Sequence, residues 1–447
     1  MRQKILVVAA GMLALLVVGA CRSEPVEITV VETVEVEKEV IVVETVEVEK
    51  VVEKEVTVVA TVEVQVPSEP EQKEYVLGVV LPFTGPLGSF GVGFRDGIEL
   101  AVEQMNAQLE ASGSSVRFST ASADTEGTPD GAAKAFQTVV QTSGAEVVVG
   151  PLSTSEVLGA KQFADENQIT LVAPASSGNA AAIPDDFVFR VMNPPDTFAA
   201  QAFAGIAEAR GYENIVILHV DDPFGNGLAE GFQKLFAGDV TTVKYAPDPP
   251  DLSSETSKVS AEVTAMSETG STAFFCICFL GDAQKLLQQA VVDPTLRTVD
   301  WMGVENLRNP DLLGDPAQAE FLADVNFTSV SFSATENPNT QAFITAYMEK
   351  YGEEPGPFTN YAYDAANIAM LSMMVAGNDG AAVKEIVPFI AGHYIGTQVQ
   401  TYLDENGDQA VANLGVYQVA ADGSDFVEVG LYEGASGIVT LAEQAVQ

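Results

Sequence analysis

The chain has 447 residues, of which 47% are hydrophobic, and a formal net charge of −42 at pH 7. A chain of this length and apolar content can bury the cores of two ordinary lobes together with an appendage. Because so acidic a protein repels phosphate backbones and anionic headgroups alike, the composition argues against nucleic acid as a partner.

The N-terminus has the layout of a secretory signal. Two basic residues precede an apolar run from Ile5 to Val18, which is too short for a confident membrane span. The stretch VGAC at 18–21 resembles a bacterial lipobox, which implies that Cys21 becomes the lipid-modified first residue of the mature protein. Cleavage without lipidation and an uncleaved N-terminal anchor are the alternatives. Each of them places the body of the chain outside the cytoplasm.

Residues 22–74 contain a ribbon from Val26 to Val66 that is almost wholly valine, glutamate, threonine and lysine, in which VVETVEVEK occurs twice, beginning at Val30 and at Val42. Residues 22–74 carry 15 acidic and 5 basic residues. Its β-branched residues favour extended backbone over helix, and it can build neither clean heptads nor a globular core. Because the charges keep the ribbon solvated, we predict an extended stalk. The alternative is a coiled-coil or strand-paired oligomerisation element.

From Tyr75 onward, short apolar runs alternate with segments that are apolar at helical spacing. YVLGVVLPF precedes a glycine-rich loop and IELAVEQMNAQL, and the same order returns in AEVVVG, ITLVAP, NIVILHV and STAFFCICF, each with the segment that follows it. This alternation predicts an α/β fold of parallel sheets flanked by helices. Ligands on such sheets bind beyond the carboxyl ends of the strands, where helix N-termini present free N–H groups.

Hydroxyl residues follow two consecutive predicted strands, Ser-Thr-Ser at 153–155 and Ser-Ser-Gly at 176–178. Taken singly, each cluster is typical of a helix N-cap or a turn. Two clusters that open into the same crevice favour a carboxylate-sized ligand.

The sequence shows no pattern for a metal, a nucleotide or catalysis. Cys276 and Cys278 are two apart in a predicted strand, at the edge of disulfide reach, and we expect them to be small buried hydrophobes. His219 and His393 are the only histidines, and no metal-ligand spacing surrounds them. The glycine-rich loop lacks dinucleotide spacing, and neither a P-loop nor a nucleophile elbow occurs. We therefore expect that the protein binds no cofactor and no metal and that it is not an enzyme.

Seven segments resemble, in order, the leucine/isoleucine/valine-type solute-binding proteins of ABC transporters, which have the type I periplasmic binding fold. They are GVVLPFTGPLGSFGVGFRDGIELAVEQMNA, VVVGPLSTSEVLGA, ITLVAPASS, FVFRVMNPPDTFAAQAFAGIA, HVDDPFGNGLAEGF, WMGVENL and YLDENGD, within Tyr75 to about Tyr432. The resemblance implies two doubly wound lobes joined by three crossover segments, which close on a ligand like a hinge.

The resemblance also implies domain boundaries. We expect residues 75–194 and 332–414 in lobe 1, 195–331 and 415–435 in lobe 2, and a C-terminal tail at 436–447. The crossings are expected near Met192–Asp196, Val330–Ser333 and Asn413–Tyr417.

The family's amino-acid site carries over by position. Ser153 and Thr154, with Ala175 and Ser177, fall on residues that hold the ligand's α-carboxylate and, through a backbone carbonyl, its ammonium. Glu305 in MGVEN occupies the position of the carboxylate that pairs with the ammonium. Because the desolvation of such a carboxylate is offset only when a cation arrives, it acts as a specificity device. Taken alone, Glu305 would be one surface acid among 63.

The family places aromatic walls at positions that fall on Phe90, Phe224, Phe279 and Tyr363, although each could equally be core packing. Three of these are phenylalanine where tyrosine is common in the nearest amino-acid binders, which favours an apolar wall. Branched-chain or other apolar amino acids fit best. The alternative ligands are amides, urea or aromatic acids.

These features together predict a lipid-anchored extracytoplasmic receptor on the outer face of the cell membrane. It would capture an amino acid by hinge closure and deliver it to an ABC permease with its ATPase. A sensory receptor subunit and an adhesive stalked protein are the alternatives.

Overall fold

The computed structural model describes residues 72–332, 337–398 and 401–442. These belong to the second of two units of the chain, Ser68–Gln447. The predicted signal with Cys21, and the predicted stalk up to residue 71, lie outside the described residues. No helix among the described residues is long and apolar enough to cross a bilayer.

The first lobe is built on a five-stranded parallel sheet with the order β2-β1-β3-β4-β5. Its strands are β1 (Lys73–Leu81), β2 (Val116–Asp124), β3 (Val147–Val149), β4 (Thr170–Ala173) and β5 (Val188–Arg190). The last three are buried along their whole length, because helices cover both faces of the sheet. β1 begins two residues before the predicted start at Tyr75.

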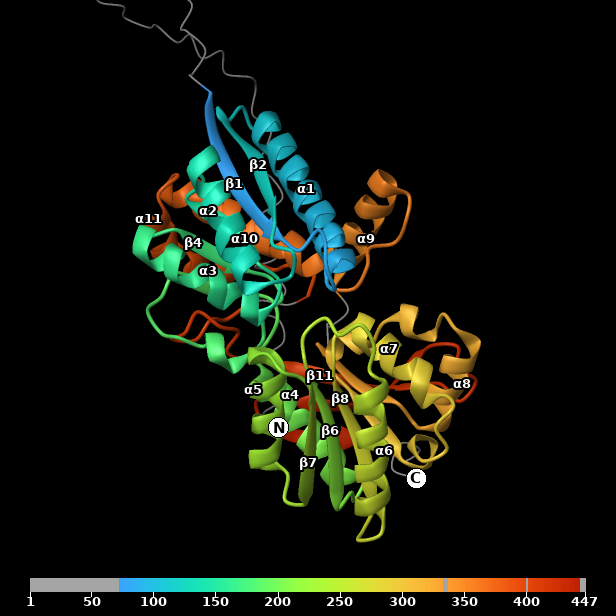
Figure 1. Ribbon diagram of the computed structural model, residues 1–447. Helices are drawn as coiled ribbons and strands as arrows, with labels where there is room; N and C mark the ends of the chain where they lie inside the picture. The colour runs from blue at the N-terminus through green and yellow to red at the C-terminus, as the bar shows by residue number, and fades with distance from the viewer. Residues whose placement is uncertain (1–71, 333–336, 399–400, 443–447) are drawn as a thin grey trace, which may run out of the picture. The chain divides into compact units, whose positions relative to one another are not determined.

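Helices of the first lobe lie around the first sheet, with α9 outside α1 (Figure 1). They are α1 (Gly88–Ala111), α2 (Pro129–Ser143), α3 (Thr154–Asn167), α9 (Pro338–Tyr351), α10 (Thr359–Ala376) and α11 (Gly380–His393). α1 and α10 pack together on one face, against alternate residues of β1 such as Val79, while α2 and α3 pack on the other face with Val80. A short 3₁₀ helix, η1 (Asn179–Ala181), follows β4.

The second lobe is built on an eight-stranded sheet with the order β13-β12-β11-β10-β9-β8-β6-β7. Its strands are β6 (Asn214–Val220), β7 (Asp239–Tyr245), β8 (Thr272–Ile277), β9 (Asp300–Gly303), β10 (Thr328–Phe332), β11 (Asn413–Val419), β12 (Phe426–Glu433) and β13 (Ile438–Leu441). β6 to β10 are parallel, whereas β11, β12 and β13 join the sheet antiparallel.

The antiparallel strands correct two expectations from the sequence. The second sheet is not wholly parallel, and the predicted tail at 436–447 instead supplies β13. A parallel partner needs a crossover of a dozen or more residues, and the short links after β11 and β12 leave room only for hairpins.

The helices of the second lobe cover both faces of its sheet. They are α4 (Asp196–Ala209), α5 (Pro223–Leu235), α6 (Ser253–Ser267), α7 (Leu280–Ala290) and α8 (Pro316–Asp324), with the 3₁₀ helices η2 (Leu296–Thr298), η3 (Glu305–Leu307) and η4 (Pro310–Leu313). Adjacent residues of β8 point to opposite faces. Phe275 packs on Phe203 of α4, with ring centroids 4.5 Å apart, and Phe274 packs on Trp301 of β9, which in turn contacts Phe321 of α8.

The chain enters the second lobe between β5 and α4, returns between β10 and α9, and enters the second lobe again before β11. The predicted crossing Met192–Asp196 spans the first passage. Val330–Ser333 begins in β10, and its last residue lies outside the described residues. Asn413–Tyr417 lies inside β11, and because Asp408 still pairs with Arg190 of β5, the chain changes lobes before Asn413.

Cys276 and Cys278 form a disulfide, with their Cα atoms 5.5 Å apart. The expectation of two separate buried thiols was therefore wrong. β8 ends at Ile277, so Cys278 leaves the extended strand and its Cα comes within the separation that a disulfide spans. Both residues are buried.

Candidate functional site

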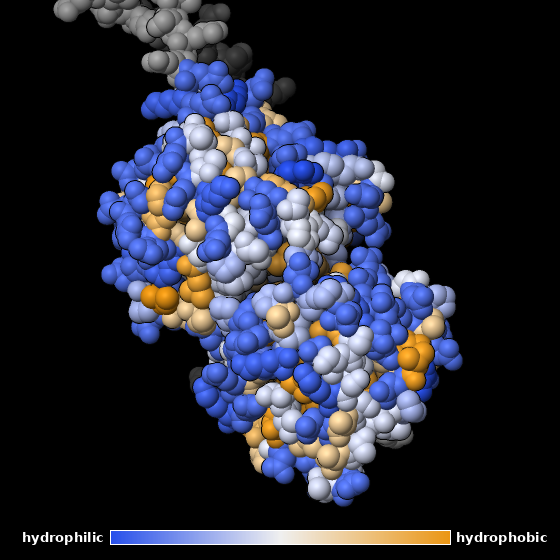
Figure 2. Space-filling model, in the orientation of Figure 1, coloured by the Kyte–Doolittle hydropathy of each residue, from blue (hydrophilic) through white to orange (hydrophobic). Residues whose placement is uncertain are grey.

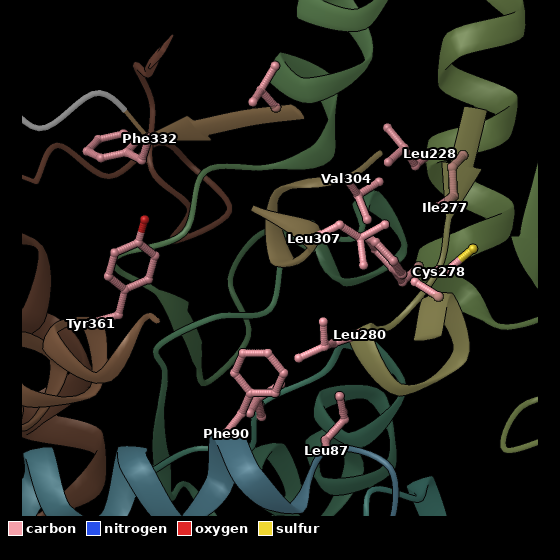
Figure 3. Packing of buried hydrophobic residues seen from close by; sticks show 14 of the residues in the cluster. Leu87, Phe90, Leu228, Ile277, Cys278, Leu280, Val304, Leu307, Phe332 and Tyr361 are labelled. Carbon is pink, nitrogen blue, oxygen red and sulfur yellow. The ribbon is translucent and has the colours of Figure 1, made fainter. Parts of the chain in front are cut away.

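A cavity of about 900 Å³, counting the space open to solvent, is lined by residues of both lobes. Most of the lining is aromatic or aliphatic, and the polar side chains are hydroxyls, amides and two carboxylates. No lysine, arginine or histidine occurs among the described residues that line it. In Figure 3, Phe90 of α1 and Leu87, the residue before α1, lie in the lower part of the view, and Val304 of the second lobe lies above them; all three line the cavity.

Eight of the nine residues predicted to bind the ligand line this cavity. They are Ser153, Thr154, Ala175, Ser177, Glu305, Phe90, Phe224 and Phe279.

Tyr363 does not line the cavity. Its ring packs on Phe343 of α9, at 4.9 Å between centroids, and its hydroxyl donates to Gln104 Oε1 at 2.6 Å. Two residues earlier on α10, the Tyr361 hydroxyl lies 3.4 Å from Glu305 Oε1. Because residues two apart on a helix face different directions, this corrects the prediction: Tyr361, not Tyr363, is the tyrosine of α10 beside the site.

The first turn of α3 is fixed beside the cavity by a capping box. Ser153 is the N-cap, its side chain accepts the backbone N–H of Glu156, and Glu156 Oε2 accepts the backbone N–H of Ser153 at 2.8 Å. Burial raises the pKa of Glu156, against hydrogen bonds from Ser153 and Thr125 that lower it. The Ser153 hydroxyl therefore stabilises the helix, while the helix dipole at this end favours an anion.

The two predicted hydroxyl clusters are in direct contact. Thr154 Oγ1 accepts the backbone N–H of Gly178 at 2.8 Å and lies 3.2 Å from Ser176 Oγ. On the far side of the loop, Arg190 Nη1 donates to the Gly178 carbonyl at 2.7 Å. The loop that carries Ser177 is thus held from both sides.

Glu305 is the first residue of η3, two residues after the end of β9, and is only partly exposed. Its Oε1 accepts the Phe332 backbone N–H at 3.0 Å and lies 3.4 Å from the hydroxyls of Ser331 and Tyr361. Burial raises the pKa of Glu305, while the Phe332 N–H and the charge of Arg308 oppose that shift. In Figure 3 the Tyr361 hydroxyl points toward Phe332. Because Tyr361 belongs to the first lobe, this contact joins the lobes at the carboxylate.

Asp196, a second carboxylate of the cavity, was not predicted. It is the first residue of α4, only 3% of its surface is exposed, and its Oδ2 has no hydrogen-bond partner among the described residues. Burial raises the pKa of Asp196 to about 7; the Ser177 side chain and the Arg190 charge oppose that shift, and the charges of Glu305 and Asp222 add to it. In the sequence, an acid at the start of a helix is the ordinary partner of the helix dipole, so nothing marked this one as exceptional.

Phenylalanine rings form the apolar wall. Phe224 of α5 stacks on Phe279 at the start of α7, with centroids 5.6 Å apart, and Phe90 of α1 lies 6.1 Å from Phe358 at the start of α10. None of these rings carries a hydroxyl. The cavity therefore combines an anion-favouring helix end, two carboxylates and an apolar wall.

The sequence model of the periplasmic binding protein family matches residues 74–424. The chain belongs to this family, as the sequence analysis predicted. Members of the family bind solutes and are not enzymes. The visible surface of this binding protein is mainly hydrophilic, with apolar residues scattered over it (Figure 2), in keeping with its 63 acidic residues.

Curated relatives include Leu/Ile/Val-binding protein homolog 3 of Brucella melitensis, which is 26% identical over 77% of this chain and 91% of its own length. Another is the Leu/Ile/Val-binding protein BraC3 of Rhizobium johnstonii, which is 24% identical over the same shares of the two chains.

Solved structures share the fold. The leucine-binding protein LivK of Thermotoga maritima has a TM-score of 0.67 at 22% identity. A solute-binding protein of R. palustris, solved in complex with benzoate, has a TM-score of 0.68 at 18% identity. Each match covers 83% of this chain and 99% of the solved one. They confirm the predicted α/β fold of the type I periplasmic binding class.

Proposed function

We propose that this binding protein captures an apolar α-amino acid outside the cytoplasm, closes on it and delivers it to an ABC permease and its ATPase. The observation that carries the proposal is the cavity itself, in which the N-terminus of α3 and the hydroxyls of Thr154 and Ser177 share one space with Glu305 and a phenylalanine wall. An α-amino acid has an anion, a cation and a side chain in matching positions. The names of the curated relatives support the same ligand class.

Lobe closure is the proposed mechanism. The first lobe holds the ligand carboxylate at α3, and the second lobe then brings Glu305 and the rings of Phe224 and Phe279 against the ammonium and the side chain. The contact between Glu305 and Tyr361 stabilises the closed form, because it joins the two lobes at the ligand. The permease recognises that closed form.

An aromatic acid is the second candidate ligand, favoured by the phenylalanine wall and by the neighbour that was solved with benzoate. The charge of the cavity disfavours it. A benzoate-like anion would meet two carboxylates and no basic side chain among the described lining residues. Amides and urea remain the uncharged alternative.

Calorimetry with a matched ligand set tests the proposal. Leucine is compared with 4-methylpentanoate, which lacks the ammonium, with 3-methylbutylamine, which lacks the carboxylate, and with benzoate, acetamide and urea. We expect leucine to bind most tightly, and Glu305→Gln to weaken it by about tenfold or more, the value of a charge-assisted hydrogen bond.

Glu320→Gln is the control, because Glu320 is an exposed carboxylate on α8 of the same lobe. Binding of benzoate or an amide but of no amino acid would contradict the proposal. A melting experiment gives a second readout, since ligand at 100 times its Kd stabilises the folded state by about 2.7 kcal/mol.

The lipid anchor is a separate part of the proposal and rests on the lipobox alone. In a bacterial host, Cys21→Ala is expected to move the chain from the membrane fraction to the soluble extracytoplasmic fraction. If the wild-type chain is already soluble after export, the anchor is excluded and the binding function is untouched.

A further inference from the structure

We propose that a second cavity, adjoining the ligand cavity, binds a small carboxylate that also carries a hydrogen-bond donor, such as a hydroxy acid, and that its occupant strengthens capture of the ligand. The guanidinium of Arg308 is the group that holds the carboxylate. The site itself goes beyond the proposed function, and only its effect on capture rests on that function.

The second cavity has a volume of about 660 Å³, counting the space open to solvent, and is lined by residues of both lobes. Arg308, directly after η3, and Ser331 of β10 come from the second lobe, whereas Thr340 of α9 comes from the first. Glu305 and Phe358 line both cavities, so the two cavities adjoin at these side chains. An occupant of the second cavity would therefore contact both lobes next to the carboxylate of the candidate site.

Arg308 is held in place without an acceptor for its guanidinium. The guanidinium packs over the ring of Tyr417, 4.4 Å from the centroid, and no described residue pairs with it or accepts its side-chain N–H groups. Arg297 of the same lobe packs in a similar way, 5.1 Å from the centroid of Phe321, but pairs with Asp324. A guanidinium is a planar fork of five donors that matches a carboxylate. Arg308 therefore lacks the partner that a carboxylate in the second cavity would supply.

Gln398 supplies the second requirement of the site. It lines the second cavity, and its Oε1 is shielded from solvent without a hydrogen-bond partner among the described residues. A buried acceptor without a donor is costly. An ionised carboxylate only accepts hydrogen bonds, whereas a hydroxyl also donates one. A hydroxy acid thus brings an acceptor for Arg308 and a donor for Gln398, and its carbon skeleton meets the apolar part of the wall, which includes Phe343 and Ile344.

Glu305 couples the second cavity to the ligand cavity. Burial raises the pKa of Glu305 and the charge of Arg308 opposes that shift, so the two charges act on each other although no ion pair joins them in the described part of the chain. An ammonium that neutralises Glu305 removes its repulsion of an anion in the second cavity. An anion on Arg308 likewise offsets the repulsion between Arg308 and the ammonium. Both effects have the same sign, so each solute strengthens the binding of the other, and by linkage the factor is equal.

Calorimetric titration of the purified chain with sodium lactate and with sodium acetate, without leucine and at constant ionic strength in sodium chloride, tests the site. We expect acetate to bind about fivefold more weakly than lactate, because it has no hydroxyl to donate to Gln398. Arg308→Gln should lose at least about tenfold in affinity for both, since it removes a charge-assisted pair. Gln398→Met should lower lactate to the level of acetate, which tests the site even if the Arg308 variant does not fold.

Arg297→Gln is the matched control. It removes a stacked arginine of the same lobe that lies outside the lining of the second cavity, and we expect it to bind lactate within about twofold of wild type. The site is overturned if wild type binds no lactate, if Arg308→Gln binds it within about twofold of wild type, or if Arg297→Gln loses as much. Equal affinities of wild type for lactate and acetate would overturn the requirement for a donor.

Leucine titration with and without saturating lactate tests the coupling. We expect lactate to tighten leucine binding by about fivefold in wild type and to leave it unchanged in Arg308→Gln. Lactate that weakens leucine binding equally in both proteins would place lactate at the N-terminus of α3 and overturn the assignment. Lactate that binds through Arg308 without changing the affinity for leucine would overturn the coupling alone. If wild type binds no leucine, the proposed function fails, whereas the lactate titration still decides whether the second cavity is a site.

Discussion

Arg190 and Asp408, which are 218 residues apart in the sequence, form an ion pair that is 99% buried on each side. The pair joins β5 to the segment that leads into β11, and the same guanidinium holds the Gly178 carbonyl in the loop beside the ligand cavity. One side chain therefore fixes both a passage between the lobes and a wall of the site.

Asp408→Asn is expected to destabilise the protein by about 3–5 kcal/mol, because it leaves the Arg190 charge buried without a partner. Urea denaturation measures the change. The comparison is Asp221→Asn, which breaks an ion pair to Lys244 whose side chains are each 52% exposed and should cost under about 1 kcal/mol. Similar costs for the two variants would show that the buried pair has no special role.

Asp196→Asn is expected to stabilise the ligand-free protein at high pH. The pKa of Asp196 is raised to about 7 in the fold, and that of an unfolded aspartate is about 4. Ionisation of Asp196 therefore lowers the free energy of unfolding. This loss is absent below pH 4, grows between pH 4 and pH 7, and is constant above pH 7. For three pKa units the gain at pH 8 is at most about 4 kcal/mol. Melting curves at pH 4 and pH 8 check this, and an equal gain at both would contradict it.

Phe279→Ala is expected to weaken leucine binding by about 1.5–3 kcal/mol, because it removes one of two stacked rings from the apolar wall. Calorimetry should show a smaller loss for alanine as the ligand, since its short side chain contacts less of the wall. Phe389→Ala is the control, because Phe389 is 62% exposed on α11. Equal losses for leucine and alanine would place Phe279 outside the side-chain pocket.

Thr154→Val is expected to lower both stability and affinity, because valine cannot accept the Gly178 backbone N–H. An unpaired buried N–H costs about 1–3 kcal/mol. Thr154→Ser keeps the acceptor and should retain most of both properties. Denaturation and leucine titration of the two variants separate the contribution of the Thr154 hydroxyl from that of its methyl group. A valine variant that behaves like the serine variant would show that the hydrogen bond is dispensable.

The parallel parts of both sheets were predictable from the sequence for a physical reason. Strands covered on both faces, such as β3 and β6, are continuous apolar runs, and each is followed by a segment with helical spacing. The C-terminal strands were not predictable in this way. β12 and β13 alternate buried and exposed residues weakly, and what keeps them in the sheet is pairing to β11 rather than a signal of their own.

The candidate site was predictable where position along the chain decides it. Thr154 and Ser177 follow strand ends, and Glu305 follows β9 within a segment that resembles the family. Prediction failed where orientation or burial decides. Tyr361 and Tyr363 differ in the direction they take on α10. Asp196 differs from an ordinary helix-starting acid in its burial and in having an oxygen without a hydrogen-bond partner among the described residues.

Trp301 is the single tryptophan of the chain, and it lies in the core of the second lobe, with its indole N–H bonded to the Leu296 carbonyl at 2.9 Å. Its fluorescence is therefore a natural spectroscopic reporter of one lobe alone, whereas circular dichroism follows both. Emission and dichroism curves that coincide during denaturation would show that the lobes unfold as one cooperative unit. Curves that separate would give each lobe a stability of its own without any added label.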